Sequence, residues 1–258
     1  MACMCIGMML HGGVITAMGT FFVFSDYMKP ALRMAALMRT PVKFIYSHDA
    51  FRVGEDGPTH QPVEHEAQLR LMEKLQNHMG EDSVRVFRAA DADEMTVCWQ
   101  MAMENMDTPT ALILSRQNIK SLPEGNDYQK ARKGAYVVAG SDEQYDIILL
   151  ASGSEVSTLV EGAELLRKDG VRCRVVSVPS EGLFRRQPVG YQLLVLPSEA
   201  KVFGMTAGLP VTLQGLVGCH GRVFGMNSFG FSAPYKVLDE KLGFTPENVY
   251  KQVKEFLA

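Results

Sequence analysis

The stretch PVKFIYSHDAFRVGEDGPTHQPVEHEAQLRLMEKL, residues 41–75, contains the pattern that decides the fold. Apolar side chains alternate over 42–46, which predicts a strand, and recur at helical spacing over 63–75, which predicts a helix. A polar loop that contains Gly and Pro joins the two segments. A strand, a loop and a covering helix form the repeating unit of parallel sheets, so this stretch predicts an α/β fold.

The same alternation of strands and helices continues on both sides of this stretch. Strands are predicted over 84–87, 111–114, 135–139, 146–151, 171–178 and 201–205, and helices over 24–38, 93–104, 154–168, 235–242 and 246–257. The polar run QNIKSLPEGNDYQKARKG interrupts this pattern. We therefore expect two doubly wound domains with mainly parallel sheets, residues 1–119 and 134–258, joined by a linker over 120–133.

The composition is that of an ordinary globular protein. Of the 258 residues, 47% are hydrophobic and 21% are charged, and the net charge is −3. This balance argues against a nucleic-acid-binding protein that relies on a basic face. Five scattered Cys without a CxxC pair indicate a reducing compartment, so we expect a cytoplasmic protein in which these side chains lie in the core.

The chain starts in apolar, Met-rich sequence, MACMCIGMMLHGGV. This segment has no basic region before it and stops at His11, so it is neither a secretory signal nor long enough to cross a bilayer. We expect a helix in the core here and no membrane partner.

The polar loop at 47–66 is the segment richest in chemistry. It follows a predicted buried strand, and in open parallel sheets ligands bind where strands end. We expect His48, Asp56 and His60 to converge there, since His suits proton transfer and the binding of phosphate or hydroxyl oxygens near neutral pH. The alternative is a solvated loop, which is usually poorer in His and Gly.

The same loop offers candidate metal ligands in His60, Glu64, His65 and Glu66. Their spacing matches no HExxH pattern and they straddle a proline, so we predict no metal site. The turn ASGSE at 151–155 has neither a GxGxxG pattern nor a Walker lysine, so it is interpreted as an ordinary strand-to-helix turn.

Two further features stay open on pattern alone. Phe21, Phe24 and Tyr27 recur at intervals of three, which is typical of a core junction but also suits the binding of a flat heterocycle. Arg116 follows a predicted strand, where it could bind phosphate or pair with a structural Asp.

Several of these motifs together resemble the transketolases, which are thiamine-diphosphate enzymes. The resemblance runs through LHGG, GTFFVFSDYMKPALRMAALM, HDAFRVGEDGPTHQPVEHEAQLR, RAADADE and PTALILSRQN, and continues in ILLASGSEV, VVSVPS and NSFGFSAPYKVLDEKLGFTPENV. It implies that residues 1–119 are most of the pyrimidine-binding domain and that 134–258 are the carboxyl-terminal domain. Sister thiamine enzymes carry other loops in place of GEDGPTHQP and SRQN.

The resemblance also implies roles for single residues. Phe24 would stack on the aminopyrimidine ring of the cofactor, and Phe21 and Tyr27 would complete the aromatic pocket. His48, Asp56 and His60 would line the substrate channel, with His60 as a catalytic residue. Arg116 and His48 would hold the phosphate of the sugar substrate.

The activity implied is transfer of a two-carbon ketol unit from a ketose phosphate to an aldose phosphate, a reaction of the pentose phosphate pathway. The family's activating glutamate and its pyrophosphate-binding domain, which holds Mg²⁺ or Ca²⁺, would precede Met1. We therefore expect a homodimeric enzyme of which this chain is an inactive part, with an exposed apolar patch around residues 1–24. The alternatives are a non-catalytic sugar-phosphate-binding homologue or subunit and a sister thiamine enzyme.

One departure from the family lies inside the loop. Ala50, Phe51 and Arg52 stand where transketolases usually show Ser, an aliphatic residue and Gly. We expect this bulkier, more basic segment to alter access of the substrate.

Overall fold

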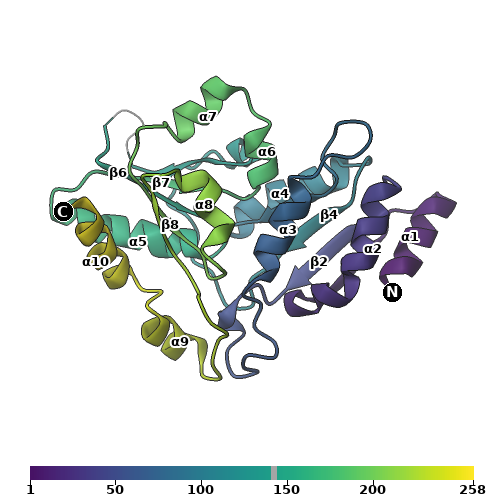
Figure 1. The fold of residues 1–258 in the computed structure, drawn as a ribbon, viewed down its shortest axis with the longest axis horizontal. Helices are drawn as coiled ribbons and strands as arrows, with labels where there is room; N and C mark the ends of the chain where they lie inside the picture. Colours follow the sequence, from purple (N-terminus) through teal and green to yellow (C-terminus); the bar gives the residue numbers. More distant parts are fainter. Residues whose placement is uncertain (141–143) are drawn as a thin grey trace.

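The computed structural model describes residues 1–140 and 144–258 and contains two sheets covered by helices (Figure 1). The first sheet has the strand order β1-β2-β4-β3, and all its neighbouring strands are parallel. Its strands are β1 (Ala17–Phe21), β2 (Lys43–Ser47), β3 (Arg85–Arg88) and β4 (Thr110–Ile113), and its helices are α1 (Ala2–His11), α2 (Ser25–Leu37), α3 (His65–Glu73) and α4 (Ala92–Glu104).

The second sheet has the order β5-β7-β6-β8-β9, in which only the pairing of β5 with β7 is antiparallel. Its strands are β5 (Tyr136–Ala139), β6 (Ile147–Ala151), β7 (Cys173–Ser177), β8 (Val202–Met205) and β9 (Arg222–Phe224). Its helices are α5 (Glu155–Lys168), α6 (Glu181–Arg185), α7 (Val189–Val195), α8 (Val211–Val217), α9 (Tyr235–Leu242) and α10 (Pro246–Leu257). The predicted α/β class with mainly parallel sheets is confirmed.

Burial explains why β6, the middle strand of the second sheet, is apolar throughout. Every residue of β6 (IILLA) is buried, because helices cover both faces of a parallel sheet. The largest cluster of buried apolar side chains includes Phe87 and Leu112 of the first sheet together with Leu149 and Phe203 of the second. The two sheets therefore share one continuous core.

The sequence pattern missed short elements. We predicted neither β1 nor the helices α6, α7 and α8, whose five to seven residues are too few to show a clear period. The expected linker 120–133 contains a 3₁₀ helix, Tyr128–Lys133. The linker is anchored at the N-cap of α4, because Leu122 N and Tyr128 Oη both donate to Asp91 Oδ2 at 2.9 Å.

The first helix forms as predicted but does not lie in the core. In α1 only Ala2 and Ile6 are buried, while Met4 and Met8 are 69% and 51% exposed. The expected apolar patch near the start of the chain is therefore present. Of the five free cysteines, Cys3 and Cys219 are exposed, so placing every Cys in the core was wrong. Within the described residues, no helix is both long and apolar enough to cross a membrane.

A cluster of buried charges joins the two sheets. Arg88, at the end of β3, is 1% exposed, and its Nη1 donates to Glu155 Oε2 at 2.5 Å and to the Ser152 carbonyl at 2.8 Å. Its Nε and Nη2 donate to Asp49 Oδ2 at 3.0 and 2.7 Å. Gly153 lies against this guanidinium, since a Cβ there would be 2.6 Å from Arg88 Cζ.

We expect Gly153→Ala to destabilise the protein much more than Gly170→Ala. Both glycines have positive φ, +64° and +80°, but a Cβ at Gly170 would meet no atom within 4 Å. The left-handed backbone costs about 1 kcal/mol for Ala at either position. Displacing Arg88 from its carboxylates adds about 3 kcal/mol at Gly153 only. Urea unfolding of both variants measures the difference, and equal losses of stability would contradict this account of the turn.

Candidate functional site

The carboxyl ends of three neighbouring strands carry the predicted site residues. In the first sheet Phe21 of β1 is opposite Ser47 of β2, and Tyr46 is opposite Ile113 of β4. The segments that follow these strands therefore leave the sheet side by side, at the edge where parallel sheets bind ligands. This edge places the aromatic segment after β1, the polar loop after β2 and Arg116 after β4 close together.

Aromatic and imidazole rings meet at this edge. Phe21 stacks on His48 with ring centroids 3.6 Å apart and planes 17° apart. The ring of His60 stands edge-on to Phe24 at 5.5 Å and 81°. Tyr27 lies 6.2 Å from Phe24 and is 84% exposed. The structure thus brings Phe21, Phe24, His48 and His60 into one cluster, with Tyr27 at its rim.

The pKa of His48 responds to several charged groups around the cluster. Burial lowers its pKa, the positive charges of Arg116 and His60 lower it further, and the carboxylates of Asp56 and Asp49 act in the opposite direction. Among the described residues no carboxylate forms an ion pair with Arg116, so the structural Asp weighed for it is not found there. Asp56 is exposed in the loop. The predicted polar residues therefore gather around His48.

The backbone of the loop is held by a segment far away in the sequence. Gln61 Nε2 donates to the carbonyls of Gly54 and Phe231 at 3.0 and 2.9 Å. Ser232 Oγ donates to the Glu55 carbonyl at 2.6 Å. No local feature of the sequence predicts this role for residues 231–232. Only their place in the resembling stretch NSFGFSAPYK pointed to them.

Of the candidate metal ligands, the structure brings together only Glu64 and His65, with Asp26 as a third member. Asp26 Oδ2 lies 3.1 Å from His65 Nε2, but the Lys29 ammonium donates to Asp26 Oδ1 at 2.8 Å. Lys29 therefore supplies a positive charge where a cation would bind. Glu66 is used elsewhere, because it accepts from Arg70 Nη2 at 3.2 Å.

The expected effect of residues 50–52 on substrate access was wrong. Arg52 is buried and turned away from the cluster, and donates to Glu155 Oε1 and Asp239 Oδ1 at 2.7 Å each. Phe51 packs on Phe244 with centroids 4.7 Å apart. These side chains join the loop to α5 and α9. The ASGSE turn accepts hydrogen bonds from two guanidinium groups, those of Arg52 and Arg88.

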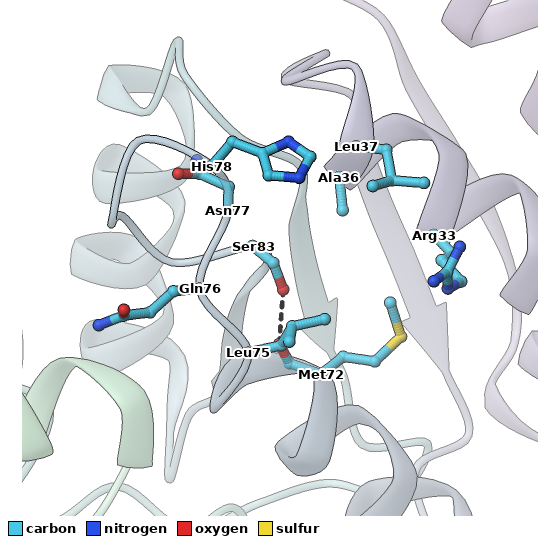
Figure 2. A pocket seen from close by; sticks show the side chains of 9 residues that line it. All are labelled: Arg33, Ala36, Leu37, Met72, Leu75, Gln76, Asn77, His78 and Ser83. Atoms are coloured by element: carbon cyan, nitrogen blue, oxygen red, sulfur yellow. Dashed lines mark hydrogen bonds between the residues drawn. The ribbon is translucent and has the colours of Figure 1, made fainter.

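A separate small pocket lies between α2 and the segment after α3 (Figure 2). Its volume is about 60 Å³, and Leu37, Met72 and Leu75 line it with His78 at one side. Ser83 Oγ donates to the Met72 carbonyl at 2.7 Å. None of the predicted site residues lines it, so it is distinct from the cluster around His48.

Comparisons with known proteins point the same way as the motifs. The family model described as transketolase, pyrimidine binding domain, matches residues 1–121, and the one described as transketolase-like TK C-terminal domain matches 134–245. The chain is 43% identical over 251 residues to a transketolase of Staphylococcus epidermidis and 44% identical over 254 residues to one of Halalkalibacterium halodurans. These matches cover 96% and 97% of this chain and 37% of either relative, so the chain spans little more than a third of their length.

Solved structures give the same picture. Transketolase from Leishmania mexicana superposes with a TM-score of 0.89 at 36% identity, covering 99% of this chain and 36% of that one. A Pichia stipitis transketolase in complex with sedoheptulose 7-phosphate has a TM-score of 0.84 at 33% identity, over 93% and 34% of the two chains. A split-gene transketolase, described as an inactive β4 tetramer, shares the fold at 22% identity with a TM-score of 0.75, covering 99% of this chain and 80% of that one.

We expect Arg116→Gln to raise the pKa of His48 toward its ordinary value, because the charge of Arg116 opposes protonation of the imidazole. Arg116→Lys keeps the charge and should change this pKa much less. The ring proton signals of His48, followed by NMR through a pH titration, measure both effects. An unchanged midpoint in the Gln variant would show that the two side chains do not interact.

Proposed function

Because this chain belongs to the transketolase family, we propose that it forms one wall of an active site that transfers a two-carbon ketol unit from a ketose phosphate to an aldose phosphate, with thiamine diphosphate as cofactor. The observation that carries the proposal is the meeting of Phe21 with His48, and of Phe24 with His60, at the carboxyl edge of the first sheet. A solvated loop would not need these ring contacts.

The aromatic residues fit the pyrimidine half of the cofactor. His48 already covers one face of Phe21, whereas Phe24 is only partly buried and Tyr27 beside it is exposed. Aromatic faces of this kind stack on flat heterocycles. We assign Phe24 to the aminopyrimidine ring, with Phe21 and Tyr27 at its sides. The bound cofactor supplies the nucleophilic carbon, and the protein supplies orientation and charge.

The polar residues fit a sugar phosphate. Since the pKa of His48 is lowered, its imidazole is neutral near pH 7 and offers a hydrogen bond, while Arg116 offers a guanidinium fork to the phosphate. Asp56, exposed in the loop, accepts from a donor hydroxyl. Thr59 Oγ1 lies 2.9 Å from His60 Nδ1, which leaves Nε2 of His60 to hold or move a proton at a sugar oxygen. The complex of the Pichia stipitis relative with sedoheptulose 7-phosphate supports this substrate class.

Binding of the diphosphate and of the metal needs residues from outside this part of the protein. Within the described residues the only cluster of metal-ligand type is that of Asp26, Glu64 and His65, and it carries the Lys29 ammonium. We therefore assign Mg²⁺ or Ca²⁺ and the diphosphate to a pyrophosphate-binding domain of another chain, or of another part of the same protein. The exposed apolar face of α1 favours burial in a homodimer. The enzyme so assembled would act in the pentose phosphate pathway of the cytoplasm.

We expect the 258-residue chain to show no ketol transfer with xylulose 5-phosphate, ribose 5-phosphate, thiamine diphosphate and Mg²⁺. Fusing it behind the whole part of the Staphylococcus epidermidis relative that precedes the matched region should produce turnover, because that part would supply both the pyrophosphate-binding domain and the activating glutamate. A coupled assay of aldose phosphate release measures both. His60→Ala should lower the kcat of the fusion by about 100-fold or more, since it removes a proton-transfer group.

Turnover by the chain alone would contradict its role as a partial site. A fusion that binds the sugar phosphate in calorimetry but never turns over would favour a non-catalytic sugar-phosphate-binding homologue instead.

A further inference from the structure

We propose that Asp49 and Arg88 are positioning residues that hold His48 and Arg116 in place for the phosphate of the sugar. The second sheet in turn anchors Arg88, and so contributes to the placement of both phosphate-binding residues. This inference rests on the proposed function. It concerns two buried residues, neither of which is among those assigned above to the cofactor or the substrate.

One carboxylate oxygen connects three strand ends. Asp49 Oδ2 accepts from Arg88 Nε at 3.0 Å and Nη2 at 2.7 Å, and from Ser115 Oγ at 3.1 Å. Asp49 directly follows His48, and Ser115 directly precedes Arg116. A single atom therefore fixes the backbone next to both phosphate-binding residues, and their spacing depends on it.

The backbone at His48 needs such support. Its φ is +62°, a left-handed conformation that is unfavourable for a residue other than Gly. Conformations of this kind persist only where the surroundings impose them. Asp49 is 6% exposed and tied to Arg88, so its side chain can hold the adjacent peptide in this conformation.

Arg88 is in turn anchored by the second sheet. Its Nη1 donates to Glu155 Oε2 and to the Ser152 carbonyl, and Gly153 leaves room for the guanidinium. Glu155 also accepts a hydrogen bond from Arg52 Nη1, so its carboxylate is held between the two arginines. The chain of contacts from α5 through Arg88 and Asp49 to Ser115 links the second sheet to the phosphate-binding residues.

The test uses Ser115→Ala, which removes one hydrogen bond without leaving a buried charge unpaired. In the 258-residue chain, ribose 5-phosphate and inorganic phosphate are titrated while the His48 ring signals are followed by NMR. We expect Ser115→Ala to weaken binding of both ligands by about tenfold, because misplacing a binding group by a fraction of an ångström is costly. Ser115→Thr keeps the hydroxyl and should retain most of the affinity.

Ser83→Ala is the matched control. It removes the 2.7 Å hydrogen bond from Ser83 Oγ to the Met72 carbonyl in the pocket of Figure 2, away from the site. It should leave the affinity for both ligands unchanged. Unfolding midpoints in urea identify any variant that loses affinity by failing to fold. Equal affinity of Ser115→Ala and the parent chain, or no binding by the parent chain, would overturn the proposal.

The fusion enzyme provides a second readout. Ser115→Ala should raise the KM of phosphorylated donors about tenfold with kcat little changed, and should leave the KM of hydroxypyruvate, which has no phosphate, unaltered. A general structural defect would affect both donors and would overturn the inference. If Arg116→Gln left phosphate binding intact, the assignment of the phosphate site, and with it the proposed function, would fail instead.

Discussion

The arrangement of this protein depends on the burial of the Arg88 guanidinium between two sheets. Removing a charged group from water is unfavourable unless partners compensate it, and a buried charge that loses its partner destabilises a protein by about 3–5 kcal/mol. Asp49 lies just after β2 of the first sheet, and Glu155 begins α5, the helix that follows β6 of the second sheet. The guanidinium is therefore satisfied only when both carboxylates are in place. This requirement favours a docking of the two sheets that brings both carboxylates to Arg88.

The candidate site is built on the same cluster. Its residues lie at the carboxyl end of the first sheet. Phe21 is the last residue of β1, and His48, His60 and Arg116 lie on the loops that follow the strands. Loops hold side chains in position only when other parts of the fold restrain them. Here the restraint comes from the second half of the chain, through Glu155 on one side and through the segment 231–232 on the other.

The distribution of chemistry fits the proposal that this chain forms one wall of a ketol-transfer site. It provides aromatic faces, imidazoles and a guanidinium, which suit a heterocycle and a sugar phosphate. Two of its buried carboxylates, those of Glu155 and Glu66, are paired with arginines and so are not available to a metal ion. Helix α1, which carries exposed apolar side chains, lies at the outer end of the molecule beside α2 (Figure 1), where further protein surface could cover it.

The sequence by itself determined the α/β class, most of the long helices and strands, and the position of His48 and Arg116 after strand ends, because periodicity and loop composition are local properties. It misjudged Arg52, whose departure from the usual residue of the family led us to expect an effect on substrate access. The partners of Arg52, Glu155 and Asp239, lie 103 and 187 positions further along the chain, and no local pattern reports them. It also placed α1 in the core, since an apolar segment looks the same whether its own chain or another surface covers it. Only the tertiary structure decided which charges are buried, because that depends on the partners that folding brings into contact.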